Sequence, residues 1–260
     1  LYRRLGYVLI GGSEGGAVPK KKLPDAGDYS IRPWKPDDLP DLVRIHSAER
    51  VRFVRGPEDF LAFLSCKRWG PTNAFLICNG KGRPVAYVVS SCSKDKGTGE
   101  ARVEFIEMAG SRWAIACSLR ALLKRCGAEK VVLSWLTTDE EMRAIARSFG
   151  WRAKLHESHR TVGIVAPELF WLRCEALLRE RLGSEVFESL HFEVTEEGIV
   201  LSFQGEKLVL DGMSELTNLV FLPEGARDEL NLALRAGSAL ARVLGRIFPL
   251  PLPDYELNFI

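Results

Sequence analysis

The order of strand-like and helix-like segments over residues 29–165 constrains the fold of this chain more than any other feature. Apolar or alternating runs bounded by Gly, Pro, Asn and Asp indicate strands, and apolar residues at helical spacing indicate helices. The order is β-α-α-β-β-β-α-β-α-β-β, and one helix crosses between two strands that we expect to be parallel. This order predicts one mixed α/β domain. The segments are 29–33, 36–46, 57–67, 73–78, 84–92, 101–108, 113–125, 130–136, 139–149, 151–154 and 160–165.

Composition indicates boundaries on both sides of this domain. Residues 11–28 are rich in Gly, Pro and Lys and offer no apolar face, which is the composition of a linker. From Glu168 the pattern changes to a helix, three short strands and two more helices, which predicts a separate α+β unit. We therefore expect the tail of a preceding domain over 1–10, a linker over 11–28, a mixed-sheet domain over 29–166 and a C-terminal domain over 167–260.

Charge and cysteine usage limit the classes of partner. The 36 basic and 34 acidic residues nearly cancel, which argues against nucleic acid or an anionic membrane as a partner. The six cysteines are scattered singly, as in a protein of a reducing compartment, and no apolar run is long enough for a membrane span. We expect a cytoplasmic protein that binds its ligand in a pocket.

The start of the chain repeats a pattern found at the end of the mixed-sheet domain. Leu1–Tyr7 aligns with Ile145–Trp151, each being the end of a helix, a Gly and then an aromatic residue. The chain also begins at Leu1 without an initiator methionine. We expect it to be the C-terminal portion of a longer protein.

This repeated segment resembles one in the GNAT acetyltransferase superfamily, in which a Tyr-x-x-x-Gly-Phe-like sequence precedes the last strands. Two such units followed by a small α+β domain resemble the Eis-type acetyltransferases, whose third domain is similar to a sterol carrier protein. The segment 212–221 is similar to a Leu-Thr-x-Leu-hydrophobic stretch of that third domain. The resemblance implies acetyl-CoA as cosubstrate, a small-molecule primary amine as acceptor and a homo-oligomer.

The GNAT cofactor loop is Gln/Arg-x-x-Gly-x-Gly/Ala, whose glycines let backbone N–H groups approach a pyrophosphate at a helix N-terminus. Here residues 109–116 keep Gly110, but Trp113 and Ile115 stand where close approach is needed. The simpler interpretation is a helix N-terminus that packs its Trp into the core. On either view we expect this domain to have lost cofactor binding.

Two residues are candidates for catalysis in the whole enzyme. Where the first copy of the repeat has Tyr2, a phenol able to protonate a leaving thiolate, the second has Ala146, which carries no proton. In Eis-type enzymes the C-terminus lies in the active site, so the resemblance makes the Ile260 carboxylate a base for the amine. Alternatively, Tyr2 and the proline-rich tail 249–260 only pack.

Other polar groups are weaker candidates. His156 and His159 have metal-ligand spacing but should point to opposite faces of an extended segment, as should the potential bases Glu104 and Glu107. The run 20–22 of three lysines is typical of a solvated surface. Two other functions remain open, a non-catalytic scaffold and a C-terminal domain that binds a hydrophobic ligand.

Overall fold

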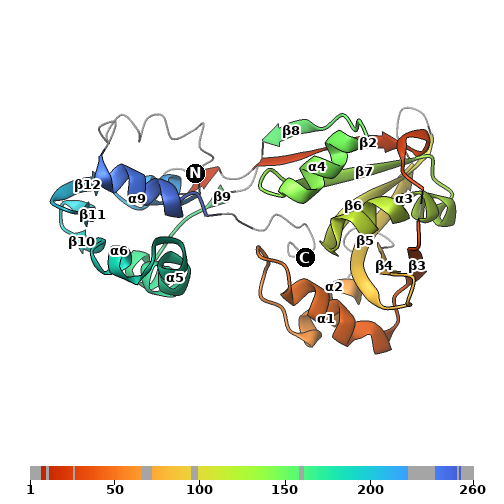
Figure 1. Ribbon diagram of the computed structural model, residues 1–260, viewed down its shortest axis with the longest axis horizontal. Helices are drawn as coiled ribbons and strands as arrows, with labels where there is room; N and C mark the ends of the chain where they lie inside the picture. The colour runs from red at the N-terminus through yellow and green to blue at the C-terminus, as the bar shows by residue number, and fades with distance from the viewer. Residues whose placement is uncertain are drawn as a thin grey trace. The chain divides into compact units, whose positions relative to one another are not determined.

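The computed structural model describes residues 7–9, 12–25, 27–65, 72–94, 99–157, 161–221, 238–250 and 252, which form two compact units (Figure 1). The first, called here the seven-stranded unit, spans Gly12–His156. The second, the three-stranded unit, contains residues 7–9 and the described residues from Glu157 to Leu252. Each unit has its own hydrophobic core.

A mixed sheet with the strand order β3-β4-β5-β6-β7-β2-β8 forms the centre of the seven-stranded unit. The registered pairs are antiparallel except β6–β7, which is parallel and connected by a helical crossover, as predicted. The strands are β2 (Gly12–Pro19), β3 (Ser30–Pro33), β4 (Thr72–Cys78), β5 (Pro84–Lys94), β6 (Ala101–Gly110), β7 (Lys130–Leu136) and β8 (Lys154–Glu157).

Helices cover both faces of this sheet (Figure 1). On one face α1 (Leu39–Ser47), which follows the 3₁₀ turn η3 (Pro36–Asp38), and α2 (Pro57–Ser65) pack on β4, β5 and β6 through a core that contains Leu42 and Phe60. The other face carries α3 (Arg112–Cys126) and α4 (Glu140–Ser148). These four helices were predicted, and their apolar stripes explain why the sheet is buried on both sides.

The prediction of a linker over residues 11–28 is wrong for most of that segment. Gly12–Pro19 is strand β2, which pairs with β7 from Ser13↔Leu136 to Pro19↔Lys130. A Cβ atom on Gly15 would lie 2.2 Å from the Leu133 carbonyl oxygen, so glycine is what allows the two backbones to approach. Lys20–Lys22 form a 3₁₀ turn, and Leu23 is buried in the core.

The end of the predicted mixed-sheet domain also differs. The strand expected over 151–154 is β8, which begins at Lys154. The strand expected over 160–165 is the short β9 (Thr161–Val162), which pairs with β1 (Val8–Leu9) in the three-stranded unit and is no part of the large sheet.

The three-stranded unit is an α+β unit, as predicted. Its antiparallel sheet is packed against helices, and Trp171 stacks on Phe192 with ring centroids 4.6 Å apart. The sequence predicts the last helix of this unit over 227–248, and its expected start lies outside the described residues; α6 was not predicted. None of the described helices is long and apolar enough to cross a membrane. The elements are α5 (Pro167–Leu182), α6 (Ser184–Glu188), β10 (His191–Thr195), β11 (Gly198–Phe203), β12 (Glu206–Leu210), α7 (Met213–Phe221) and α9 (Ala239–Ile247).

Candidate functional site

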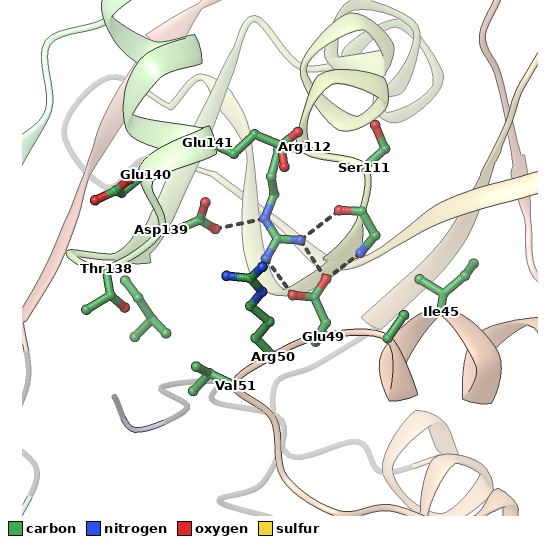
Figure 2. Close-up of a pocket in the computed structure, with 13 residues that line it drawn as sticks. Ile45, Glu49, Arg50, Val51, Ser111, Arg112, Thr138, Asp139, Glu140 and Glu141 are labelled. Carbon is green, nitrogen blue, oxygen red and sulfur yellow. Dashed lines mark hydrogen bonds and ion pairs between the residues drawn. The ribbon is translucent and has the colours of Figure 1, made fainter. Parts of the chain in front are cut away.

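A cavity of about 840 Å³ lies in the seven-stranded unit where the parallel strands β6 and β7 end (Figure 2). Three segments line it: 45–51 at the end of α1, 110–112 at the β6–α3 turn and 136–141 at the β7–α4 turn. The carboxyl ends of adjacent parallel strands are the usual place for a ligand in α/β sheets. The cavity is therefore our candidate site.

The β6–α3 turn is tightly fixed to the neighbouring strand. Gly110 has φ +90°, and a Cβ atom there would lie 2.3 Å from the Val85 carbonyl oxygen, so only glycine fits. The Ser111 N–H donates to that carbonyl at 3.0 Å, and the Ser111 hydroxyl accepts the Ala114 N–H at 3.2 Å as the N-cap of α3. The N–H and the hydroxyl of Ser111 thus both have partners within the chain.

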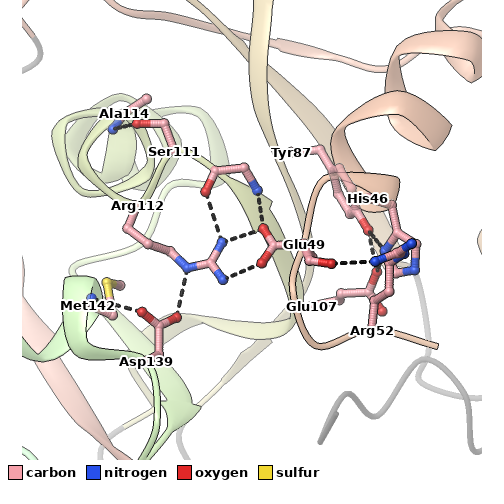
Figure 3. Close-up of polar contacts among 11 residues, drawn as sticks. His46, Glu49, Arg52, Tyr87, Glu107, Ser111, Arg112, Ala114, Asp139 and Met142 are labelled. Carbon is pink, nitrogen blue, oxygen red and sulfur yellow. Dashed lines mark hydrogen bonds and ion pairs between the residues drawn. The ribbon is translucent and has the colours of Figure 1, made fainter. Parts of the chain in front are cut away.

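The carboxylate of Glu49 occupies the space in front of this turn (Figure 3). Its Oε1 accepts the Gly110 N–H at 2.6 Å and the Arg112 Nη1 at 2.8 Å, and its Oε2 accepts Nη2 at 2.8 Å. Backbone contacts hold Glu49 there, since its N–H donates to the His46 carbonyl at 3.0 Å and its carbonyl accepts Arg52 Nη1 at 2.6 Å. A helix N-terminus favours an anion, and here the chain supplies one.

Asp139 holds Arg112 from the opposite side. One of its oxygens accepts Arg112 Nε at 2.8 Å, and the other accepts the Met142 N–H at 2.9 Å as the N-cap of α4. The Arg112 side chain is 8% exposed, and burial by itself would lower the pKa of its guanidinium. The hydrogen bonds and negative charges of Glu49 and Asp139 raise this pKa by more than burial lowers it. The pKa of the Arg112 guanidinium is therefore raised, and Arg112 joins all three segments that line the cavity.

A second polar cluster, called here the His46–Glu107 cluster, lies beside the first (Figure 3). Arg55 donates to both oxygens of Glu107 at 2.8 Å each, and the Tyr87 hydroxyl donates to Oε1 at 2.5 Å. His46 Nδ1 lies 3.0 Å from that hydroxyl. The side chains of Arg55 and Glu107 are 1% and 0% exposed, so this cluster is internal.

The structure corrects two expectations about the β6–α3 turn. Trp113 does not pack into the core: the residue is 46% exposed, and its ring stacks on Phe149 at 5.7 Å. Ile115, which belongs to α3, is fully buried in the hydrophobic core. The group in front of the turn is Glu49, which sequence reasoning missed.

The catalytic candidates Tyr2 and Ile260 lie outside the described residues, as does His159. Ala146, the counterpart of Tyr2, is buried in the core on α4. His156 is exposed. Within the described residues, no group of three or more His, Cys, Asp or Glu side chains is arranged to hold a metal ion.

The other polar candidates have structural contacts. Glu104 pairs with Arg102 at 3.3 Å on the half-exposed part of β6, whereas Glu107 is buried. Lys20 contacts Glu129 at 3.4 Å. The helix expected over 139–149 begins at Glu140 with Asp139 as its N-cap, and nothing in the sequence marked Asp139 as a partner of Arg112. Glu49 follows a helix end and carries no motif, so no local signal marked it.

Solved structures provide the comparison for this fold. A conserved protein of unknown function from Enterococcus faecalis, named a probable N-acyltransferase, matches 98% of this chain and 69% of its own at 13% identity and a TM-score of 0.63. A GCN5-related N-acetyltransferase from Anabaena variabilis matches 97% of this chain and 68% of its own at 15% identity and a TM-score of 0.57. This chain has the fold of the GCN5-related N-acetyltransferases (GNATs).

A GNAT from Kribbella flavida gives a third match, covering 98% of this chain and 68% of its own at 17% identity and a TM-score of 0.57. No protein-family model and no curated protein matches the chain. The matches therefore establish the GNAT fold, and the predicted fold class is confirmed.

Proposed function

We propose that this chain is part of an N-acetyltransferase that transfers an acetyl group from acetyl-CoA to a primary amine of a small molecule. Within that enzyme the seven-stranded unit is a non-catalytic GNAT-fold unit, and the three-stranded unit is a further structural domain. The GNAT fold of the chain supports the reaction class. The assignment of a non-catalytic role rests on one observation, the Glu49 carboxylate at the β6–α3 turn.

An oxyanion of a cofactor at the Gly110 end of this turn would compete with Glu49 for the donors that Glu49 already uses. The Gly110 N–H and two Arg112 nitrogens are bonded to its carboxylate, and the next N–H, that of Ser111, is bonded to the Val85 carbonyl. A pyrophosphate there would also face the negative charge of Glu49, which disfavours it. These contacts support a unit that does not bind acetyl-CoA.

Calorimetric titration of the 260-residue chain with acetyl-CoA tests this role. We expect no saturable heat at micromolar concentrations. One saturable site with a low-micromolar dissociation constant would refute the non-catalytic assignment. Desulfo-CoA serves as a second ligand, because it keeps the phosphates and removes the thioester.

We further propose Tyr2 as the general acid toward the coenzyme A thiolate and the Ile260 carboxylate as the base for the acceptor amine. In a protein that includes the preceding domain, Tyr2→Phe should lower kcat by roughly 10²-fold or more, the scale of a lost general acid. Tyr7→Phe is the matched control and should leave kcat unchanged.

Residues added after Ile260 should lower turnover while the melting temperature stays constant, because they displace the terminal carboxylate without changing the core. Full activity in both the Tyr2→Phe and the extended proteins would remove these two residues from the mechanism.

A further inference from the structure

Two cysteines that are far apart in the sequence meet at the C-terminal end of α3. Cys92 lies on β5, and Cys126 is the last residue of α3. Cys92 is paired with Val103 of β6, whose side chain belongs to the same hydrophobic core that Cys126 packs against. Because directly paired residues of neighbouring strands point to the same face of a sheet, the Cys92 side chain lies on the face that carries α3. We call these two residues the Cys92–Cys126 pair.

The two thiols of this pair contact each other at the wall of a small cavity. Burial, followed by a hydrogen bond between its thiol and that of Cys92, raises the pKa of Cys126 to about 12. Both side chains line a cavity of about 270 Å³, and Arg125 lines it too. A water molecule occupies about 30 Å³ of liquid, so a small polar oxidant has room there. Cys92 is exposed and Cys126 is half-buried, so the oxidant reaches Cys92 first.

The surroundings of the pair favour a bond between the two sulfur atoms over a structural metal site. A structural zinc site uses four protein ligands, and the pair supplies two. Within the part of the chain that the structure describes, no group of three or more His, Cys, Asp or Glu side chains is arranged to hold a metal ion. Cys117 and Cys174 differ from the pair, because burial alone raises the pKa of each thiol. The pair is therefore set apart by the contact between its two thiols.

We propose that Cys92 and Cys126 are a site of reversible oxidation, at which hydrogen peroxide joins the two thiols in a disulfide bond. In the first step the Cys92 sulfur attacks one peroxide oxygen. An S–O bond forms, the O–O bond breaks, and the departing hydroxide leaves as water with the thiol proton, so that Cys92 becomes a sulfenic acid. In the second step the Cys126 sulfur attacks the Cys92 sulfur. The S–S bond forms, the S–O bond breaks, and a second water leaves with the Cys126 proton.

The surroundings of each thiol determine this order of steps. A thiolate is the reacting species, and the raised pKa of Cys126 keeps its thiol protonated at neutral pH. The exposed Cys92 therefore reacts with peroxide. Once Cys92 is a sulfenic acid, it places no negative charge beside Cys126, while the positive charge of Arg125 still lowers the pKa of Cys126. The second thiol thus becomes easier to ionise after the first has reacted.

The pair is separate from the candidate site. The cavity of the candidate site includes Ser111 and Arg112 at the N-terminal end of α3, whereas Cys126 ends the same helix. The disulfide would tie the C-terminal end of α3 to β5 and leave the residues of that cavity unchanged. This inference therefore does not depend on the acetyltransferase proposal.

The test uses the reduced 260-residue chain and equimolar hydrogen peroxide at neutral pH. Free thiols are then blocked with N-ethylmaleimide, and the protein is digested without reductant and analysed by mass spectrometry. We expect two of the six thiols to be lost, a peptide that links Cys92 to Cys126 within one chain, and recovery of both thiols with dithiothreitol.

Three variants test the role of each thiol. Cys126→Ser leaves the Cys92 sulfenic acid without a partner, so dimedone should label Cys92. Cys92→Ser should slow the loss of thiols by about tenfold or more, because Cys126 has hardly any thiolate at neutral pH. Cys174→Ser is the matched control, since it removes another half-buried thiol and should leave the linked peptide unchanged.

Peroxide treatment that leaves both thiols of the pair reduced would overturn the proposal. It would also be overturned if Cys92 became a sulfinic acid, or bonded to another chain or another cysteine, while Cys126 stayed reduced. Loss of thiols at the wild-type rate in Cys92→Ser would contradict the order of steps. None of these results bears on the acetyl-CoA titration, so the two proposals fail separately.

Discussion

Two arginine–glutamate pairs in the seven-stranded unit have the same geometry and different surroundings. Arg55–Glu107 and Arg112–Glu49 each join two nitrogens to two oxygens at 2.8 Å. The first pair is 1% and 0% exposed and lies inside the core, whereas the second is 8% and 14% exposed and lines a cavity. Burial distinguishes the two pairs: the internal pair is shielded from solvent, whereas the cavity pair lies at the wall of an open space.

The largest expected difference concerns removal of one partner from the internal pair. Glu107→Gln leaves the charge of Arg55 buried without its carboxylate, and we expect the free energy of unfolding to fall by about 3–5 kcal/mol. Urea unfolding measures this. Glu104→Gln, on the same strand but in a half-exposed pair with Arg102, should cost no more than about 1 kcal/mol. Equal losses in the two variants would mean that burial does not distinguish the pairs.

A smaller effect is expected at Asp139, on the cavity side. Asp139→Ala removes the N-cap of α4 and one partner of Arg112, and should lower the free energy of unfolding by about 1–2 kcal/mol. Asp139→Asn keeps a side-chain oxygen for the Met142 N–H and should cost less, because Asn caps a helix as well as Asp does. An Asn variant as unstable as the Ala variant would show that the charge facing Arg112 matters more than the cap.

The smallest effect is a pH dependence that only the internal cluster should show. Burial lowers the pKa of His46, although Glu107 nearby opposes this shift. Below its ordinary pKa of about 6.5 the unfolded chain binds a proton that the folded chain does not. The contribution of His46 to the free energy of unfolding is therefore fully present above that pH. It decreases as the pH falls toward the pKa of the folded chain, by at most about 1.4 kcal/mol per pH unit.

Urea unfolding between pH 7.5 and 5.5 tests this slope. His46→Gln should remove it, and Glu49→Ala should keep it, since Glu49 belongs to the other pair. A slope that disappears in Glu49→Ala instead would link the two clusters.

Sequence patterns predicted most elements of the fold because they have the ordinary periodicities. The helices over 39–47 and 140–148 have apolar stripes, and β4 and β5 are apolar runs around an Asn-Gly turn. Strand β2 was missed because four of its eight residues, Gly12, Gly15, Gly16 and Pro19, have poor strand propensity. Close approach of its backbone to β7 overrides that propensity, and this approach depends on a partner far away in sequence.

The site was predictable only in part for the same reason. Gly110 and the start of α3 stand together in a local motif, so the turn could be found. Glu49 lies 61 residues before Gly110 in the sequence and has no motif of its own. Whether another part of the chain fills the space in front of the first turn of α3 depends on how segments far apart in sequence are placed in the fold. Local patterns in a single sequence do not predict that placement.

The pairing of β2 with β7 has a consequence for how this unit is made. During synthesis β2 leaves the ribosome long before β7. The glycine-rich backbone of β2 therefore cannot pair with β7 until Lys130–Leu136 has been synthesised. Contacts of such large sequence separation form slowly. Until they form, the edge of β7 has unpaired N–H and C=O groups that can pair with other chains. Nascent or N-terminally truncated chains should therefore depend on chaperones more than the local strength of their helices suggests.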